Sequence, residues 1–245
     1  MYLSSFDFDL PYIENIKSIN SLMNAQKCTY EEALKIDYIL NWKEKRRNFR
    51  LETRCITSMF ERLLGKFKNE KCQKIIIECS ENNIESSILN FSGIITVQLQ
   101  MNHEKFLKKK DIEKKEVTLK LLMKGIKKVA INENWNLDPF ENISEIVKSN
   151  KYSNEWIWKK PIKNLNKSYS AEVLCQHSVK NMDIFIIVKE INGDEIYREK
   201  IISELPDEWA YSKHLGELKW MSNSEIGLTN KAKSNTITIL VPSLK

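Results

Sequence analysis

The stretch that decides the fold is Ile184-Phe185-Ile186-Ile187-Val188, which runs through Lys189-Glu190-Ile191 into the pair Asn192-Gly193. Five consecutive β-branched or aromatic residues predict a strand buried on both faces, because a strand with one wet face alternates polar and apolar side chains. Asn-Gly between two strand-like runs predicts a type I′ turn, which needs positive φ at both central positions. We therefore expect a central strand whose chain folds straight back over residues 194–202.

The segment just before this stretch has the clearest strand pattern of the chain. Between Tyr169 and Val179, apolar residues alternate with mainly polar ones, so one face of the strand is apolar and the other polar. Further strands are expected near residues 156–158, 218–220, 226–228 and 237–241. About six strands with short connections predict a mainly antiparallel sheet in the C-terminal half.

The N-terminal half shows helical periodicity instead. Thr29-Tyr30-Glu31-Glu32 is a capping box that starts a helix. Apolar spacing continues this helix to between Gly65 and Asn69, either as one rod or with a bend near residues 45–48. The other patterns predict helices over residues 12–26, 105–131 and 139–148, strands over 73–80 and 93–101, a turn at 81–83, and a short strand or connection over 84–91.

Together these patterns predict an α+β fold. Its N-terminal half is helix-rich with two or three strands, and its C-terminal half is mainly an antiparallel β-sheet. A boundary near Asn150 divides the chain into a helix-rich region with a small strand pair, residues 1–150, and a β-rich region, residues 151–245. One continuous domain is the alternative, because no flexible linker separates the halves.

Composition narrows the broad class of the protein. The chain is 42% hydrophobic and 29% charged with only 6 Gly and 5 Pro, which is typical of a globular protein. Its apolar runs are far shorter than the roughly 20 residues that span a bilayer, and Asp7 and Asp9 interrupt the N-terminus. Five cysteines at unpatterned spacings fit reduced thiols. We therefore expect a cytoplasmic protein without membrane insertion.

Two basic clusters suggest a nucleic-acid hypothesis in a chain of net charge +6. The first spans residues 43–54 and contains the candidate contacts Arg46, Arg47, Arg50 and Arg54. The second spans residues 105–115. Acidic residues interrupt both, and only Phe49 interleaves with the first, whereas a single-strand binder also needs aromatic stacking faces. Solvated helix faces with local ion pairs are the favoured interpretation, and a nucleic-acid-binding regulator is the alternative.

The sequence contains no recognisable catalytic, metal or cofactor motif. His103, His177 and His214 have no metal-ligand spacing, and six glycines make a phosphate-binding loop hard to build. We expect His177 to be a core residue and expect neither metal nor cofactor. An enzyme with a site near His214 is one alternative, because this histidine has three acidic residues close in sequence, Asp207, Glu208 and Glu217.

Aromatic residues concentrate in the later part of the chain. Tryptophan and tyrosine dominate protein interfaces, so five of them are interface candidates: Trp156, Trp158, Trp220, Trp209 and Tyr211. Packing in the core is the alternative for each. The leading hypothesis is a non-enzymatic cytoplasmic protein that binds another protein, such as the immunity partner of a bacterial toxin or another inhibitor. The net charge of +6 argues against a nuclease toxin as the partner, because an acidic inhibitor would complement such a target better.

Overall fold

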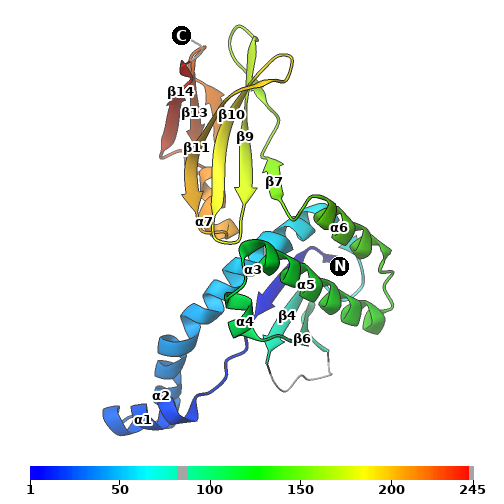
Figure 1. The fold of residues 1–245 in the computed structure, drawn as a ribbon, viewed down its shortest axis with the longest axis vertical. Coiled ribbons are helices and arrows are strands. Elements are labelled where there is room, and N and C mark those ends of the chain that lie inside the picture. Colours follow the sequence, from blue (N-terminus) through cyan, green and yellow to red (C-terminus); the bar gives the residue numbers. More distant parts are fainter. Residues whose placement is uncertain (82–87, 243–245) are drawn as a thin grey trace. The chain divides into compact units, whose positions relative to one another are not determined.

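The structure of the chain, a computed structural model, describes residues 1–81 and 88–242. It divides into two units, Met1–Tyr152 and Ser153–Lys245, and each unit has its own hydrophobic core. Helices lie mostly in the first unit and antiparallel sheets in the second (Figure 1), so the expected α+β fold class is confirmed. Within the described ranges, no helix is both long and apolar enough to cross a membrane.

A four-stranded sheet forms the centre of the first unit. Its order is β2 (Ser5–Asp9), β4 (Lys74–Ser80), β6 (Ile94–Gln100) and β5 (Leu89–Phe91). The first three strands are parallel, and β5 is antiparallel to β6. Buried and half-exposed residues alternate along β2, β4 and β6, because helices cover only one face of this sheet. The sequence patterns did not predict strand β2 or the parallel order of β2, β4 and β6. They predicted strands over residues 73–80 and 93–101, and a short strand or connection over 84–91.

Three helices cover the apolar face of this sheet: α3 (Lys43–Leu64), α5 (Asp111–Glu133) and α6 (Asp138–Ser149). Helix α3 packs along β2, where the rings of Phe6 and Phe60 meet edge-on with centroids 5.5 Å apart. Helix α5 passes so close to β4 that a Cβ atom at Gly125 would lie 2.8 Å from Ile77 Cδ1. A glycine in mid-helix is therefore required there by packing. Two short strands, β1 (Tyr2–Leu3) and β3 (Phe67–Lys68), pair separately.

Two further helices, α1 (Ile16–Gln26) and α2 (Tyr30–Asp37), form an arm at the end of α3 that is remote from the sheet (Figure 1). The predicted capping box is present, because Thr29 N–H donates to Glu32 Oε2 at 2.9 Å and Glu32 N–H donates to Thr29 Oγ1 at 3.3 Å. A π-helical stretch, Tyr38–Trp42, joins α2 to α3. This stretch interrupts the expected single rod at residues 38–42, ahead of the bend expected near residues 45–48, and α3 ends at Leu64 with Gly65 as its C-cap.

The other expectations for this unit hold with adjusted bounds. The helix expected over residues 105–131 is two helices, α4 (His103–Leu107) and α5, and the helix expected over 12–26 begins only at Ile16. Residues 82–87, which include most of the expected turn at 81–83 and half of the segment 84–91, lie outside the described residues. The rest of that segment is Ile88 and β5.

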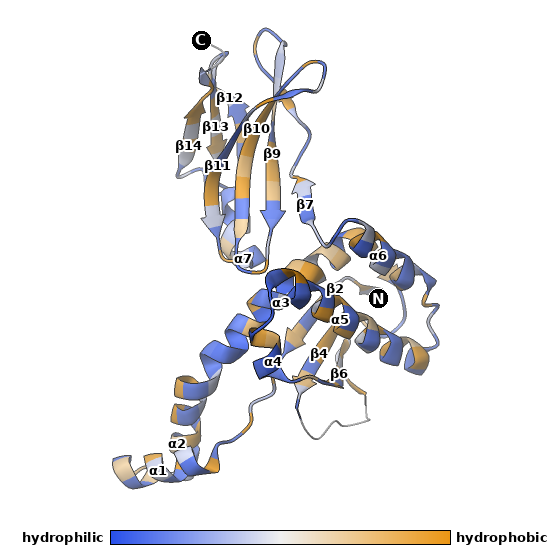
Figure 2. Cartoon of the chain, in the orientation of Figure 1, coloured by the Kyte–Doolittle hydropathy of each residue, from blue (hydrophilic) through white to orange (hydrophobic). Residues whose placement is uncertain are grey.

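The second unit consists of two antiparallel sheets that share one core. The larger has the order β11 (Glu195–Glu204), β10 (Met182–Glu190), β9 (Tyr169–His177) and β7 (Asn154–Ile157), with β8 (Ile162–Lys163) also paired to β9. The smaller is β12 (Glu217–Trp220), β13 (Glu225–Thr229) and β14 (Thr236–Leu240). Apolar residues of both sheets form the shared core, as the hydropathy colouring of β9, β10 and β13 shows (Figure 2). Strand β10 is central, as predicted, with Ile184, Ile186 and Val188 fully buried.

The hairpin between β10 and β11 forms, but its turn differs from the expected type I′. Gly193 has φ +98°, and its N–H donates to the carbonyl of Glu190 at 3.0 Å. This hydrogen bond makes Ile191 and Asn192 the central residues of the turn. Asn192 does not have the positive φ that a type I′ turn requires. The type I′ assignment is wrong because the pairing register shifts after Val188, and this bulge places only the glycine in the left-handed region.

Candidate functional site

A crevice of about 640 Å³ opens at the carboxyl ends of β2, β4 and β6. Its floor is formed by residues that follow or end these strands, namely Leu10, Cys79, Glu81, Met101 and His103. In sheets with parallel strands, ligands bind in the crevice outside the carboxyl ends of the strands. The crevice is therefore the leading candidate site in the described part of the chain.

The opposite wall of the crevice comes from the π-helical stretch and its neighbours. Asp37, Asn41 and Trp42 line it, and π-helical turns within α-helices are frequent at functional sites. Asp37 is buried and accepts hydrogen bonds from Tyr12 Oη at 2.6 Å and Asn41 Nδ2 at 2.7 Å. Burial alone would raise the pKa of Asp37, but hydrogen bonds to its carboxylate, from Ser18 among others, outweigh it and hold the pKa below its ordinary value. The wall is thus polar and its carboxylate is ionised.

His103 lies at the floor of the crevice as the first residue of α4. Its side chain is 3% exposed, and its ring meets Phe49 edge-on at 5.7 Å. The backbone N–H of His103 donates to Glu81 Oε1 at 3.1 Å. Neither ring nitrogen forms a hydrogen bond with a described residue. A buried polar group without a partner costs about 1–3 kcal/mol, so the ring is an energetically unfavourable feature of the crevice floor that packing alone does not explain.

The electrostatics of the crevice define what it can bind. Burial lowers the pKa of His103 to about 4, and the charge of Lys45 acts in the same direction. The ring is therefore neutral at pH 7, with one nitrogen as donor and the other as acceptor. The ionisable residues that line the crevice are four carboxylates and two lysines, a net charge of −2: Glu14, Asp37, Glu81, Glu104, Lys17 and Lys45. This field disfavours phosphates and favours cations.

No protein family model, curated protein or solved structure matches this chain. Among residues 1–81 and 88–242, no group of three or more His, Cys, Asp or Glu side chains is placed to hold a metal ion.

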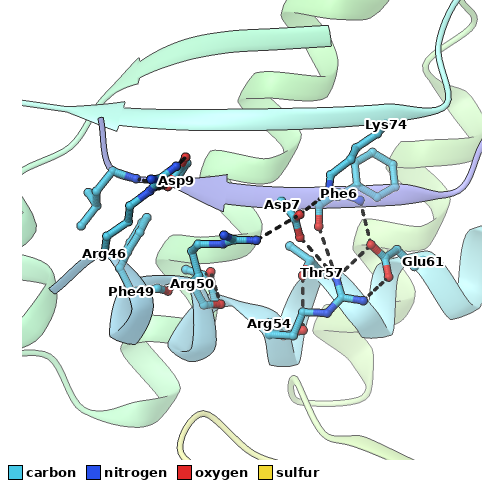
Figure 3. A network of polar contacts seen from close by, with 12 residues as sticks. Phe6, Asp7, Asp9, Arg46, Phe49, Arg50, Arg54, Thr57, Glu61 and Lys74 are labelled. Carbon is cyan, nitrogen blue, oxygen red and sulfur yellow. Dashed lines mark hydrogen bonds and ion pairs between the residues drawn. The ribbon is translucent and has the colours of Figure 1, made fainter. Parts of the chain in front are cut away.

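Arginines of the first basic cluster are paired with carboxylates (Figure 3). Arg46 donates from Nε to Asp9 Oδ1 at 2.6 Å and from Nη2 to Asp9 Oδ2 at 2.5 Å. Arg54 binds both carboxylate oxygens of Glu61, at 2.9 and 2.6 Å. Asp9 lies on β2, and Glu61 lies seven residues after Arg54 on α3. Neither is one of the acidic residues inside the cluster that the sequence suggested as local partners.

The other two arginines of that cluster are exposed. Arg50 Nη2 lies 3.7 Å from Asp7 Oδ2, while Arg47 forms no ion pair with a described residue. In the second cluster, the buried Lys114 donates to Glu52 at 2.7 Å. Paired and buried cations of this kind connect elements of the first unit.

His214 is paired with a glutamate that the sequence pattern did not indicate. Its Nε2 lies 2.9 Å from Glu204 Oε1, and Lys213 Nζ lies 3.2 Å from the same oxygen. The hydrogen bond from His214 lowers the pKa of Glu204 below its ordinary value. His177 is 1% exposed, as expected for a core residue, and its ring lies 6.0 Å from that of Tyr211.

The five aromatic interface candidates fall into three groups by exposure. Trp220 and Tyr211 are each 6% exposed and belong to the core of the second unit. Trp156 and Trp158 are half-buried and pack against the same core. Trp209, on the short helix α7 (Glu208–Tyr211), is 92% exposed. Of these five side chains, only that of Trp209 projects into solvent.

The crevice is not visible in the sequence, because its residues come from separate segments between Leu10 and Glu104. One weak signal exists: His103 lies two residues after the end of the strand pattern of residues 93–101. A polar residue just after a strand is at the edge where parallel strands bind ligands, but this reading requires knowing that the strands are parallel.

Proposed function

We propose that the first unit binds a small amine-bearing molecule in the crevice. The buried ring of His103 supports this proposal, because its two nitrogens have no hydrogen-bond partner among the described residues. A ligand with one hydrogen-bond donor and one acceptor would satisfy both nitrogens. The net charge of −2 in the lining of the crevice favours an ammonium group over a phosphate, although nucleotides commonly bind at this edge of parallel sheets.

Methionine-methyl NMR on the full chain tests this function. Of the seven methionines, Met101 lies in the crevice. Titration with argininamide, which carries cationic groups and a neutral amide, should shift the Met101 methyl signal saturably and leave that of Met221 in the second unit unchanged. Adenosine monophosphate should not shift it. A Met101 signal that is unmoved by argininamide at about 1 mM, or moved better by the nucleotide, would contradict the proposal.

A matched pair of histidine variants locates the interaction. His103→Phe keeps a ring that can pack against Phe49 but removes both nitrogens, so argininamide should bind about tenfold or more weakly. His214→Gln changes a histidine of the second unit and should leave the affinity unchanged. Equal affinity of His103→Phe and the parent would show that the ring does not contact the ligand.

Binding of another protein is a second candidate function, and the exposed indole of Trp209 favours it. A tryptophan that is 92% exposed contributes little to its own unit and resembles an interface hot spot. We propose that a protein partner, such as a toxin, contacts this residue. None of the five cysteines forms a disulfide, which supports a reducing compartment such as the cytoplasm for either function.

Affinity capture from a native lysate tests the second candidate when parent and variants are compared. Trp209→Ala should keep the thermal stability of the parent and lose a partner that the parent retains. Phe91→Ala removes another exposed aromatic, one that is 80% exposed in the first unit, and should retain that partner. A partner captured equally by all three proteins does not bind through Trp209, and this outcome would count against the proposal.

A further inference from the structure

A second cavity in the first unit, of about 550 Å³, lies along α5 and α6, and we name it the α5–α6 groove. Four apolar side chains form its floor: Leu119, Met123, Leu137 and Tyr152. Leu119 is buried, and the other three are half-buried against the core of the first unit. The groove shares no lining residue with the crevice at His103. It therefore presents an apolar surface that the proposed amine site does not use.

Lysines form one edge of this groove. Lys120, Lys124 and Lys127 are exposed and follow each other at intervals of four and three residues, so they lie on one side of α5 over about 10 Å. None of the three forms an ion pair or a hydrogen bond with a described residue. They are thus available to carboxylates from another molecule.

The total charge of the groove is opposite in sign to that of the crevice. On the α6 side, Lys148 donates to Glu145 at 2.7 Å. The lining contains four lysines, counting Lys148, against the two carboxylates of Glu116 and Glu141, and with Glu145 included as the partner of Lys148 the net charge is +1. An apolar floor with a positive edge is complementary to a ligand that is apolar on one side and acidic beside it.

We propose that the α5–α6 groove docks an acidic amphipathic helix of another protein. Apolar residues of such a helix would cover the floor, and acidic residues at i, i+4 and i+7 would face Lys120, Lys124 and Lys127. The spacing of the lysines favours a helix over a fatty acid, because a single carboxylate would meet one lysine and leave the others unpaired. The apolar floor favours a helix over a nucleic acid, whose phosphates would leave Met123 and Leu137 uncovered.

A designed peptide tests this docking site on the full chain. The probe is a fluorescent helical peptide of about 15 residues with leucines on one face and glutamates at i, i+4 and i+7 beside it. Its binding should shift the methyl signal of Met123, which lies in the groove, and leave that of Met101 in the crevice unchanged. The two signals keep this proposal separate from the amine proposal, since either can fail alone.

Two triple variants separate the groove from general charge attraction. Lys120→Glu with Lys124→Glu and Lys127→Glu should weaken peptide binding at least about tenfold in fluorescence anisotropy. The control changes the net charge equally at three exposed lysines outside the groove, Lys68→Glu with Lys105→Glu and Lys108→Glu, and should bind like the parent. Met123→Gln leaves all lysines in place and should also weaken binding, so a groove triple variant that fails to fold does not end the test.

Several results would overturn the proposal. A scrambled peptide of the same composition that binds equally well, or equal losses in both triple variants, would assign the attraction to charge alone. A peptide that does not bind by about 1 mM, or binds without shifting Met123, would show that the groove is not the docking site. If laurate shifts Met123 and the peptide does not, the groove holds a small amphiphile, and the helix assignment is wrong.

Discussion

The ring of His103 connects the candidate site to the pH dependence of stability. Its pKa in the folded chain is about 4, below the ordinary value of 6.5, chiefly because the ring is buried. Between these two values the unfolded chain binds more protons than the folded chain, so the free energy of unfolding falls as the pH falls. The neutral ring of His103 makes its full contribution to the free energy of unfolding above pH 6.5. Roughly 3 kcal/mol of that contribution is lost by pH 4.

His103→Phe should therefore flatten the decline of the unfolding free energy between pH 7 and pH 4, because the variant has no ring to protonate. Urea unfolding at several pH values measures this. His214→Gln is the control, since that histidine lies in the other unit beside Glu204. Parallel curves for the parent and His103→Phe would mean that the ring is protonated as easily in the folded chain as in the unfolded one.

Gly193→Val should lower the free energy of unfolding by about 1–2 kcal/mol, because a β-branched residue is strained at φ +98°. A Cβ atom there would meet nothing within 4 Å, so the loss comes from the backbone conformation and not from a clash. Gly193→Asn should cost less, since asparagine tolerates positive φ better. Urea unfolding measures both, and an unchanged midpoint for the valine variant would contradict the left-handed conformation.

At the scale of elements, ion pairs join α3 to β2. Arg46→Ala should lower the free energy of unfolding by about 1–3 kcal/mol, because it leaves the mostly buried carboxylate of Asp9 without its two charged hydrogen bonds. Arg47→Ala is the matched neighbour on the same helix, and it should change the stability by less than about 0.5 kcal/mol, since its side chain is exposed. Equal effects on urea unfolding would show that the pair with Asp9 does not hold the helix to the strand.

At the scale of the whole molecule, each unit has a separate core, and the two cores share no residue. Residues 1–152 and 153–245 should therefore each fold when expressed alone, with dispersed amide signals in NMR and a cooperative thermal transition. If either fragment gives the narrow amide dispersion of an unfolded chain, its core depends on the other unit. Such a result would contradict the independence of the two units.

The sequence by itself determined the local elements. The capping box at Thr29, the alternation that forms β9 and the apolar run that forms β10 all arise from neighbours within a few residues. Helix and strand periods depend on such neighbours, so the α+β class could be predicted from one chain. The turn at Gly193 already goes beyond this range, because a bulge in the pairing with β11 changes which residue takes positive φ.

Only the tertiary structure decided the candidate sites. The parallel order of β2, β4 and β6 brings Leu10, Glu81 and His103 to one edge, although they are far apart in the sequence. Strand order and register are set by contacts between distant segments, and so is the choice of the sheet face that helices or a second sheet cover. That choice buries Trp220 on β12, whereas Trp209 on α7 is exposed. A periodic pattern gives the faces of an element, but only the packing of distant elements determines which face water reaches.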